Sequence, residues 1–215
     1  TGFEHYVNYG NIVDDKFLDP TAPESLVYEV DGDTRTLVSA MFIAKETALD
    51  DPTLVDYGGP LMQWHVHTNL CWGRDASGEF KVMSVLETPT DTCPAGTVNA
   101  GGNNPMVHVW IAPHECGPFA ALEGHGAGQA AAADGQRLDQ CAHDDGAHTG
   151  HGADAGTDQA AAAAKPYDPS LPIDLGGLDG VTPQQQAVAE NLVAATLRDL
   201  PQFPDPAVAA AAGYH

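Results

Sequence analysis

The sequence predicts a β-rich α+β fold, an antiparallel β-sandwich or small barrel followed by a C-terminal helical pair. In residues 1–122, short runs of aromatic and β-branched residues alternate with turn residues, a spacing typical of antiparallel all-β domains. Residues 181–215 contain helix start and stop signals instead. Between them, residues 123–180 form a low-complexity segment rich in Gly, Ala, His and Asp. We therefore expect a β-rich core domain containing a histidine cluster, a long loop, and a helical segment.

Five runs in the first segment read as strands, and turn residues separate them. Asp31-Gly32-Asp33 lies between the first two runs and predicts a hairpin. Proline and glycine predict loops over 50–60 and over 93–105. The low-complexity segment cannot bury enough apolar surface to offset its ordering entropy, so we expect much of it to be loop. The predicted strands are Ser25–Val30, Thr36–Ala44, Met62–Trp72, Phe80–Val85 and Met106–His114.

The clearest helix is predicted over residues 182–200. Thr182 is a good N-cap, Pro183 suits the first helical position, and Gln185 completes a capping box. A second short helix is predicted from Asp205-Pro206 to Ala212, with Gly213 just past its end. An apolar stripe on the first helix must pack against another element; it consists of Val188, Leu192, Val193, Leu197 and Leu200.

The net charge narrows the classes of partner. The chain has 30 acidic and 8 basic residues, for a formal charge of −22. Binding to nucleic acid or to an anionic membrane surface needs clustered Lys and Arg, so we expect neither. No apolar run approaches the roughly 20 residues of a membrane span, so we expect no membrane insertion. The charge indicates solubility in a salty or extracellular setting, and the acids could also attract cations.

The four cysteines favour an oxidising compartment. Their even number predicts two disulfides in a secreted or cell-surface protein. Of the three possible connectivities, chain order favours Cys71–Cys93 with Cys116–Cys141. A cysteine-containing metal site in a reducing compartment is the alternative, although no CxxC pair is present.

The histidines predict a metal site on a sheet. In an extended strand His65 and His67 point to the same face and could offer two nitrogens to one ion. His108, His114 and His5 could complete the ligand shell, and Glu4 or Glu115 could act as a further ligand or orient an imidazole. Imidazole ligands suit copper or zinc. We therefore predict a metal-binding protein, with copper slightly favoured by the oxidising compartment.

Other interpretations stay open. An open coordination position would make the same site that of a metal-dependent enzyme. The histidines could equally be hydrogen-bonded core residues of a structural protein, and Cys71 could be a nucleophile rather than a disulfide partner. No GxSxG, Walker, GxGxxG or HExxH motif is present. Four histidines of the low-complexity segment could weakly scavenge metal ions or simply belong to a flexible polar tract; they are His125, His143, His148 and His151.

Three segments resemble a family of uncharacterised bacterial extracytoplasmic proteins with HYVN and HVW…H segments. They are Glu4–Asn8, Leu18–Glu29, and His108-Val109-Trp110 with His114, Gly117 and Phe119. The resemblance implies a shared fold with a polar histidine cluster, and it implies no activity. In such proteins a helical segment precedes HYVN, whereas here its equivalent, residues 182–214, comes last. Either the chain is a piece of a tandem array that forms a homo-oligomer or repeat assembly, or the helices pack back on the sheet.

Overall fold

A computed structural model describes most of the chain outside the low-complexity segment. The described residues are 2–16, 18–45, 51–62, 64–65, 70–74, 78, 80–86, 91–99, 104–114, 117–120, 167–176 and 180–215. They fall into two compact units. The first unit includes described residues up to His65, those of 104–120, and those of 167–215. The second includes the described residues of 70–99.

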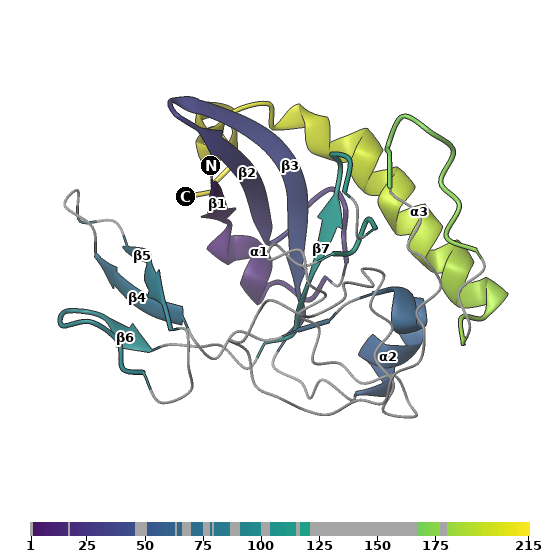
Figure 1. Cartoon of the computed structure of the whole chain (residues 1–215), viewed down its shortest axis with the longest axis horizontal. Helices are drawn as coiled ribbons and strands as arrows, with labels where there is room; N and C mark the ends of the chain where they lie inside the picture. The colour runs from purple at the N-terminus through teal and green to yellow at the C-terminus, as the bar shows by residue number, and fades with distance from the viewer. Residues whose placement is uncertain are drawn as a thin grey trace, which may run out of the picture. The chain divides into compact units, whose positions relative to one another are not determined.

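The first unit contains a four-stranded antiparallel sheet and all the described α-helices (Figure 1). Its strands are β1 (Gly2–Val7), β2 (Ser25–Asp31), β3 (Thr34–Ile43) and β7 (Met106–Trp110), and they pair in the order β1-β2-β3-β7. The helices are α1 (Tyr9–Val13), α2 (Pro52–Gly58), α3 (Pro183–Asp199) and α4 (Pro206–Ala211), with 3₁₀ turns at Gly59–Leu61 and Leu200–Gln202.

The predicted hairpin joins β2 to β3. Gly32 in its turn has φ 57°, a left-handed conformation that glycine adopts without steric cost. The pairing register then sorts the side chains of the sheet onto two faces. One, the histidine face, includes Phe3, His5, Val7, Ser25, Val27, Ser39, Met41, Ile43, Met106, His108 and Trp110. The other, the helical face, includes Glu4, Tyr6, Leu26, Tyr28, Leu37, Ala40, Phe42, Val107 and Val109.

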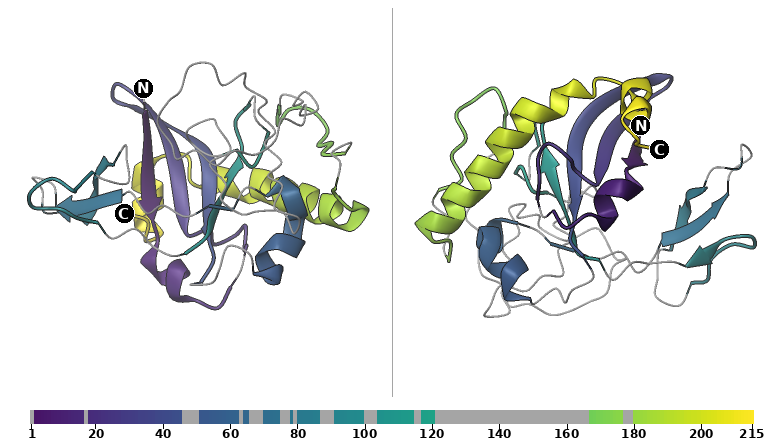
Figure 2. Two further views of the ribbon diagram at one scale, coloured as in Figure 1. Left: turned by 60° about the horizontal axis from the view of Figure 1, so that its bottom comes forward. Right: turned by 180° about the vertical axis from the view of Figure 1, so that it is seen from behind.

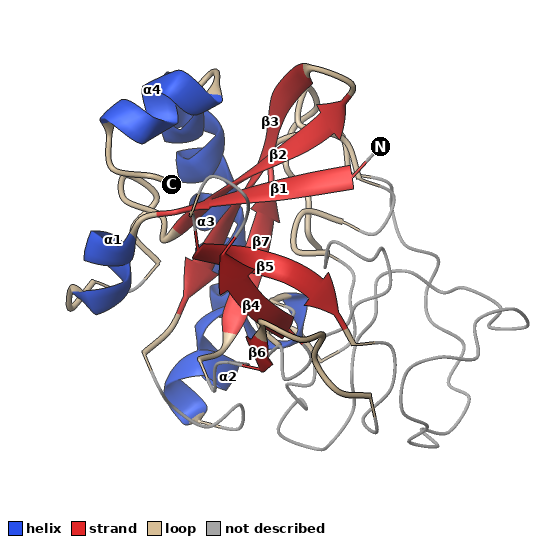
Figure 3. Cartoon of the chain, turned by 90° about the vertical axis from the view of Figure 1, so that its left-hand side faces the viewer, coloured by secondary structure: helices blue, strands red, loops and turns tan. Residues whose placement is uncertain are grey.

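The sheet curves so that its two edge strands meet over the histidine face. A flat four-stranded sheet would hold β1 and β7 about 14 Å apart. Yet the ring of Phe3 on β1 lies 5.7 Å from that of Trp110 on β7. The central strands permit this approach because they place small, fully buried side chains on this face, among them Ser25, Val27 and Ser39. Figure 3 shows the strong twist between β1 and the later strands.

Helix α3 and the segment that follows it cover the helical face. The capping box predicted at Thr182 and Gln185 is formed, and Gly213 has φ 93° just past α4. Tyr28 donates its hydroxyl hydrogen to the Phe203 carbonyl at 2.9 Å, which fixes this segment against β2. Helix α3 lies beside β7 in both views of Figure 2. The predicted apolar stripe is confirmed: Leu192, Val193 and Leu200 are buried, and Val188 and Leu197 pack against the core.

The C-terminal helices therefore pack on the sheet of their own chain, the second of the two arrangements considered above. Tyr214 is buried, and its hydroxyl donates to the Pro23 carbonyl at 3.0 Å. His215 exchanges two backbone hydrogen bonds with Val7 at the outer edge of β1. Within the described residues, no helix combines the length and the hydrophobicity needed to cross a membrane.

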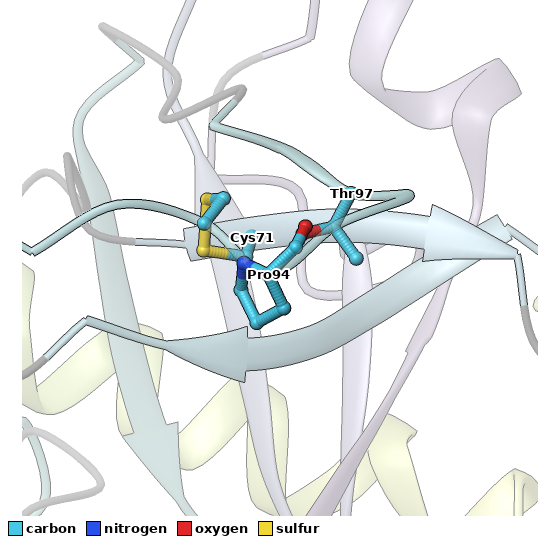
Figure 4. The surroundings of a disulfide bond; sticks show 4 residues. Cys71, Pro94 and Thr97 are labelled. Carbon is cyan, nitrogen blue, oxygen red and sulfur yellow. A yellow bond between two sulfur atoms is a disulfide. The ribbon is translucent and has the colours of Figure 1, made fainter.

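The second unit is a three-stranded antiparallel sheet in the order β5-β4-β6. Its strands are β4 (Leu70–Arg74), β5 (Phe80–Val85) and β6 (Val98–Asn99). The predicted disulfide Cys71–Cys93 is formed and ties β4 to the segment before β6 (Figure 4). In that segment Thr97 donates its backbone and hydroxyl hydrogens to the Pro94 carbonyl, closing a turn. Cys116 and Cys141 lie outside the described residues.

The coarse fold prediction is confirmed, since antiparallel sheets are combined with C-terminal helices, although the described residues contain about as much helix as strand. The described strands close no barrel, and the sandwich stays a prediction. Three local predictions are wrong. The expected loop over 50–60 contains α2, which begins with an Asp51 N-cap and Pro52. In the described part of the strand predicted over 62–72, Met62 and Trp64 are not part of a strand: Trp64 donates its backbone N–H to the Met62 carbonyl, His65 forms an isolated bridge with Met106, and β4 begins at Leu70. The expected loop over 93–105 contains the short β6.

Candidate metal site

Three of the five predicted ligands lie in one row on the histidine face. The His108 ring on β7 lies between two others, with centroid distances of 5.8 Å to His5 and 5.6 Å to His65. The His65 and His108 rings are nearly parallel, at 12°, whereas His5 meets His108 edge-on at 72°. Side chains from strand β1, strand β7 and the segment after the first 3₁₀ turn thus converge, although these segments lie far apart in the sequence.

Backbone pairing positions each ring. His108 is in the middle of β7, directly opposite Met41 of β3. His65 joins the other side of β7 through two backbone hydrogen bonds with Met106, of 3.0 and 2.8 Å, so it is the diagonal neighbour of His108. His5 reaches the row because the sheet curves, and its Nδ1 lies 3.4 Å from the hydroxyl oxygen of Ser25.

The row runs from the interior to the surface. His65 and His108 are each about 1% exposed, whereas His5 is exposed. Two buried imidazoles in contact cannot both carry charge without a large desolvation and repulsion cost, so at least one of them is neutral. Neutral imidazole is the form that binds metal ions. The row therefore offers two shielded nitrogen donors and a third that solvent reaches.

A second row of rings lies beside the first. Trp110, two residues after His108, lies 5.7 Å from Phe3 and 4.4 Å from His114. The Trp110 indole N–H donates to the Ala120 carbonyl at 2.7 Å. His114 is held by two backbone hydrogen bonds to Tyr167. His114 therefore belongs to this second row, with Phe3 and Trp110, and not to the row formed by His5, His65 and His108.

Of the remaining predicted residues, Glu4 lies within the described part of the chain, whereas His67 and Glu115 lie outside it. The paired HxH geometry therefore stays a prediction. Glu4 does not orient His5 as expected. Alternation along β1 directs it to the opposite face, where its carboxylate accepts two hydrogen bonds from Arg35, at 2.8 and 2.9 Å.

The described part of the chain contains no ready-made group of three or more His, Cys, Asp or Glu side chains that could hold an ion. Ring rotation about the side-chain dihedrals would thus be needed for the three imidazoles to share one. Sequence reasoning missed Met41 and Ser25, which lie under the row. Each was read only as part of a strand, because their proximity to the histidines depends on register across β2, β3 and β7.

Comparison with protein-family models, with curated proteins and with solved structures gives no match for this chain. The resemblance to the extracytoplasmic family therefore stays a prediction, and the functional argument depends on the histidine face itself.

Proposed function

We propose that this chain is a secreted or cell-surface protein that binds a copper or zinc ion through His5, His65 and His108. The observation on which this depends is the position of His108, whose ring contacts both of the other two. Two imidazoles bound to one ion at about 2.0–2.1 Å per nitrogen have ring centroids roughly 5–6 Å apart. The observed separations of 5.6 Å and 5.8 Å fall in that range for the two pairs that include His108.

Two further features support the proposal. The Cys71–Cys93 disulfide is typical of proteins outside the cytoplasm, where Cu(II) and Zn(II) bind without competition from thiol reductants. The formal charge of −22 raises the local concentration of cations around the molecule. His5 is exposed at one end of the row, so an ion arriving from solvent would meet its ring first.

The test is metal stoichiometry and affinity in the full chain. Because His125, His143, His148 and His151 could bind metal independently, all four are replaced by Ser in every protein compared. After chelator treatment, we expect this background protein to bind one equivalent of Cu(II) or Zn(II). His108→Gln should weaken binding by about 100-fold, since even outer-shell changes at metal sites cost 10–100-fold. Mass spectrometry of the metal and competition titration measure both quantities.

Two variants separate loss of ligand from loss of fold. His5→Ala changes an exposed ring, so the fold should survive while affinity falls by about tenfold or more. His215→Ala removes an exposed histidine outside the row and should change affinity less than about twofold. No stoichiometric binding by the background protein, or equal affinities for all variants, would overturn the proposal.

A further inference from the structure

A methionine lies under the row of imidazoles. Met41 is the β3 residue directly opposite His108 on β7. On its other side it pairs with Ser25 of β2, whose hydroxyl oxygen lies 3.4 Å from His5 Nδ1. Met41 thus occupies the strand position between His108 and the residue that contacts His5. Its side chain is 7% exposed.

The strand register and the length of the side chain place the thioether within reach of the row. Directly opposed residues of antiparallel strands have Cβ atoms about 4.5–5.5 Å apart, and methionine is long, unbranched and flexible. The nearby side chains on the central strands are small, namely Ser25, Val27 and Ser39. A second thioether, that of Met106, comes from the residue that is paired with His65 and lies two positions before His108.

The proposed metal site therefore combines nitrogen and sulfur donors. Zinc sites in proteins take thiolate, imidazole and carboxylate ligands, whereas thioether sulfur is a soft donor that favours copper, especially Cu(I). Many buried methionines only fill space in a core. Met41 differs from those because the strand register places it opposite His108 and beside Ser25.

We infer that Met41 supplies a thioether ligand that makes the site selective for copper over zinc and able to hold Cu(I). This inference depends on the metal site proposed above. It assigns His65 and His108 as the buried nitrogen donors, Met41 as the sulfur donor beneath them, and His5 as the exchangeable donor at the surface. No electron transfer is required, because Cu(I) and Cu(II) bind as ions supplied from solution.

The experiment compares Met41→Leu with Met62→Leu in the background protein that lacks the four low-complexity histidines. Leucine keeps the volume and removes the sulfur, so both variants should fold. Met62 is an equally buried control, 3% exposed, whose side chain lies against Gly58. Cu(I) affinity is measured anaerobically by competition with bicinchoninate, and Zn(II) affinity by competition with a chromophoric chelator.

We expect Met41→Leu to weaken Cu(I) binding by about tenfold or more while Zn(II) binding changes less than about twofold. Met62→Leu should leave both affinities unchanged. Copper-edge X-ray absorption should show a sulfur scatterer in the Cu(I) form that disappears in Met41→Leu. If Met41→Leu binds Cu(I) like the control, or loses both ions equally, the assignment of Met41 is wrong while the metal site stands. If the background protein binds neither ion, the site itself is refuted.

Discussion

The two faces of the four-stranded sheet are built by the same strands and differ in almost every other respect. The helical face presents Tyr28, Phe42 and their apolar neighbours to α3 and the segment after it, and these side chains are buried, whereas Glu4 at its β1 side stays partly exposed. The histidine face places small residues at its centre and rings from the two edge strands above them, and its β1 side stays exposed. Alternation along each strand thus separates the residues that stabilise the fold from those available to bind a ligand.

The largest predicted effect is on the free energy of unfolding, and it is tested by replacing one phenylalanine on each face. Phe42 on the helical face is 1% exposed, whereas Phe3 on the histidine face is 41% exposed. Phe42→Ala should lower the free energy of unfolding by about 3–5 kcal/mol, because it removes a buried ring and leaves a cavity. Phe3→Ala loses a ring that is already partly in water, so we expect about 1 kcal/mol. Urea denaturation followed by circular dichroism measures both values.

The same pair tests whether stability and ligand binding are separable. Phe3→Ala should keep the fold while loosening the contact between β1 and Trp110. Equal destabilisation by the two substitutions would contradict the comparison, because it would mean that the histidine face is as much a part of the hydrophobic core as the helical face.

The next effect concerns the carboxyl group of Glu24, the residue immediately before β2. Glu24 is 3% exposed, and burial raises its pKa from 4.5 to about 7, with Asp14 and Asp19 adding to the shift. Its carboxylate also accepts a hydrogen bond from the Ile43 backbone N–H at 3.0 Å. Because the native state binds the proton more tightly than the unfolded state, stability falls as the pH rises from about 4.5 to about 7.

Glu24→Gln should therefore stabilise the protein above pH 7, by up to about 3 kcal/mol, and the gain should vanish near pH 4. The amide oxygen can still accept the hydrogen bond from Ile43. Glu29→Gln is the matched control, since it removes one negative charge from an exposed position of the same strand. Urea denaturation between pH 4 and pH 8 measures the difference, and parallel curves for the two variants would refute a special role for Glu24.

Local sequence patterns predicted most of the helices and strands that have their own capping or turn residues. Hydrophobic runs bounded by turn residues gave β2, β3 and β5, and the capping box gave α3. Helix α2 was missed although Asp51-Pro52 is an N-cap followed by proline, because the surrounding Gly and Pro outweighed that signal. Strand β1, which pairs with β2, was not among the predicted strands. The local signals therefore predict elements better than they predict pairing partners.

The candidate site was predicted in part, for a related reason. His5, His65 and His108 were chosen by residue type and do lie together. The reason given for His65, however, was an HxH strand, whereas the structure brings it to His108 through its pairing with Met106. The position of Met41 depends on the register between β3 and β7, which a long stretch of chain separates. No periodicity within either strand encodes that register.

The smallest predicted effect concerns the start of the helix that covers the helical face. The Thr182 hydroxyl accepts the Gln185 backbone N–H at 3.2 Å, and the Gln185 side chain accepts the Thr182 backbone N–H at 2.9 Å. Thr182→Ala should cost about 1 kcal/mol, the usual value of an N-cap. Gln184→Ala is a fitting control, because Gln184 is exposed in the same turn and should change stability by less than about 0.5 kcal/mol. Hydrogen exchange should show faster opening of the first turn of α3 in Thr182→Ala alone, with the amides of β1 unaffected. If β1 opened as well, the two faces would be one cooperative unit rather than two separable surfaces.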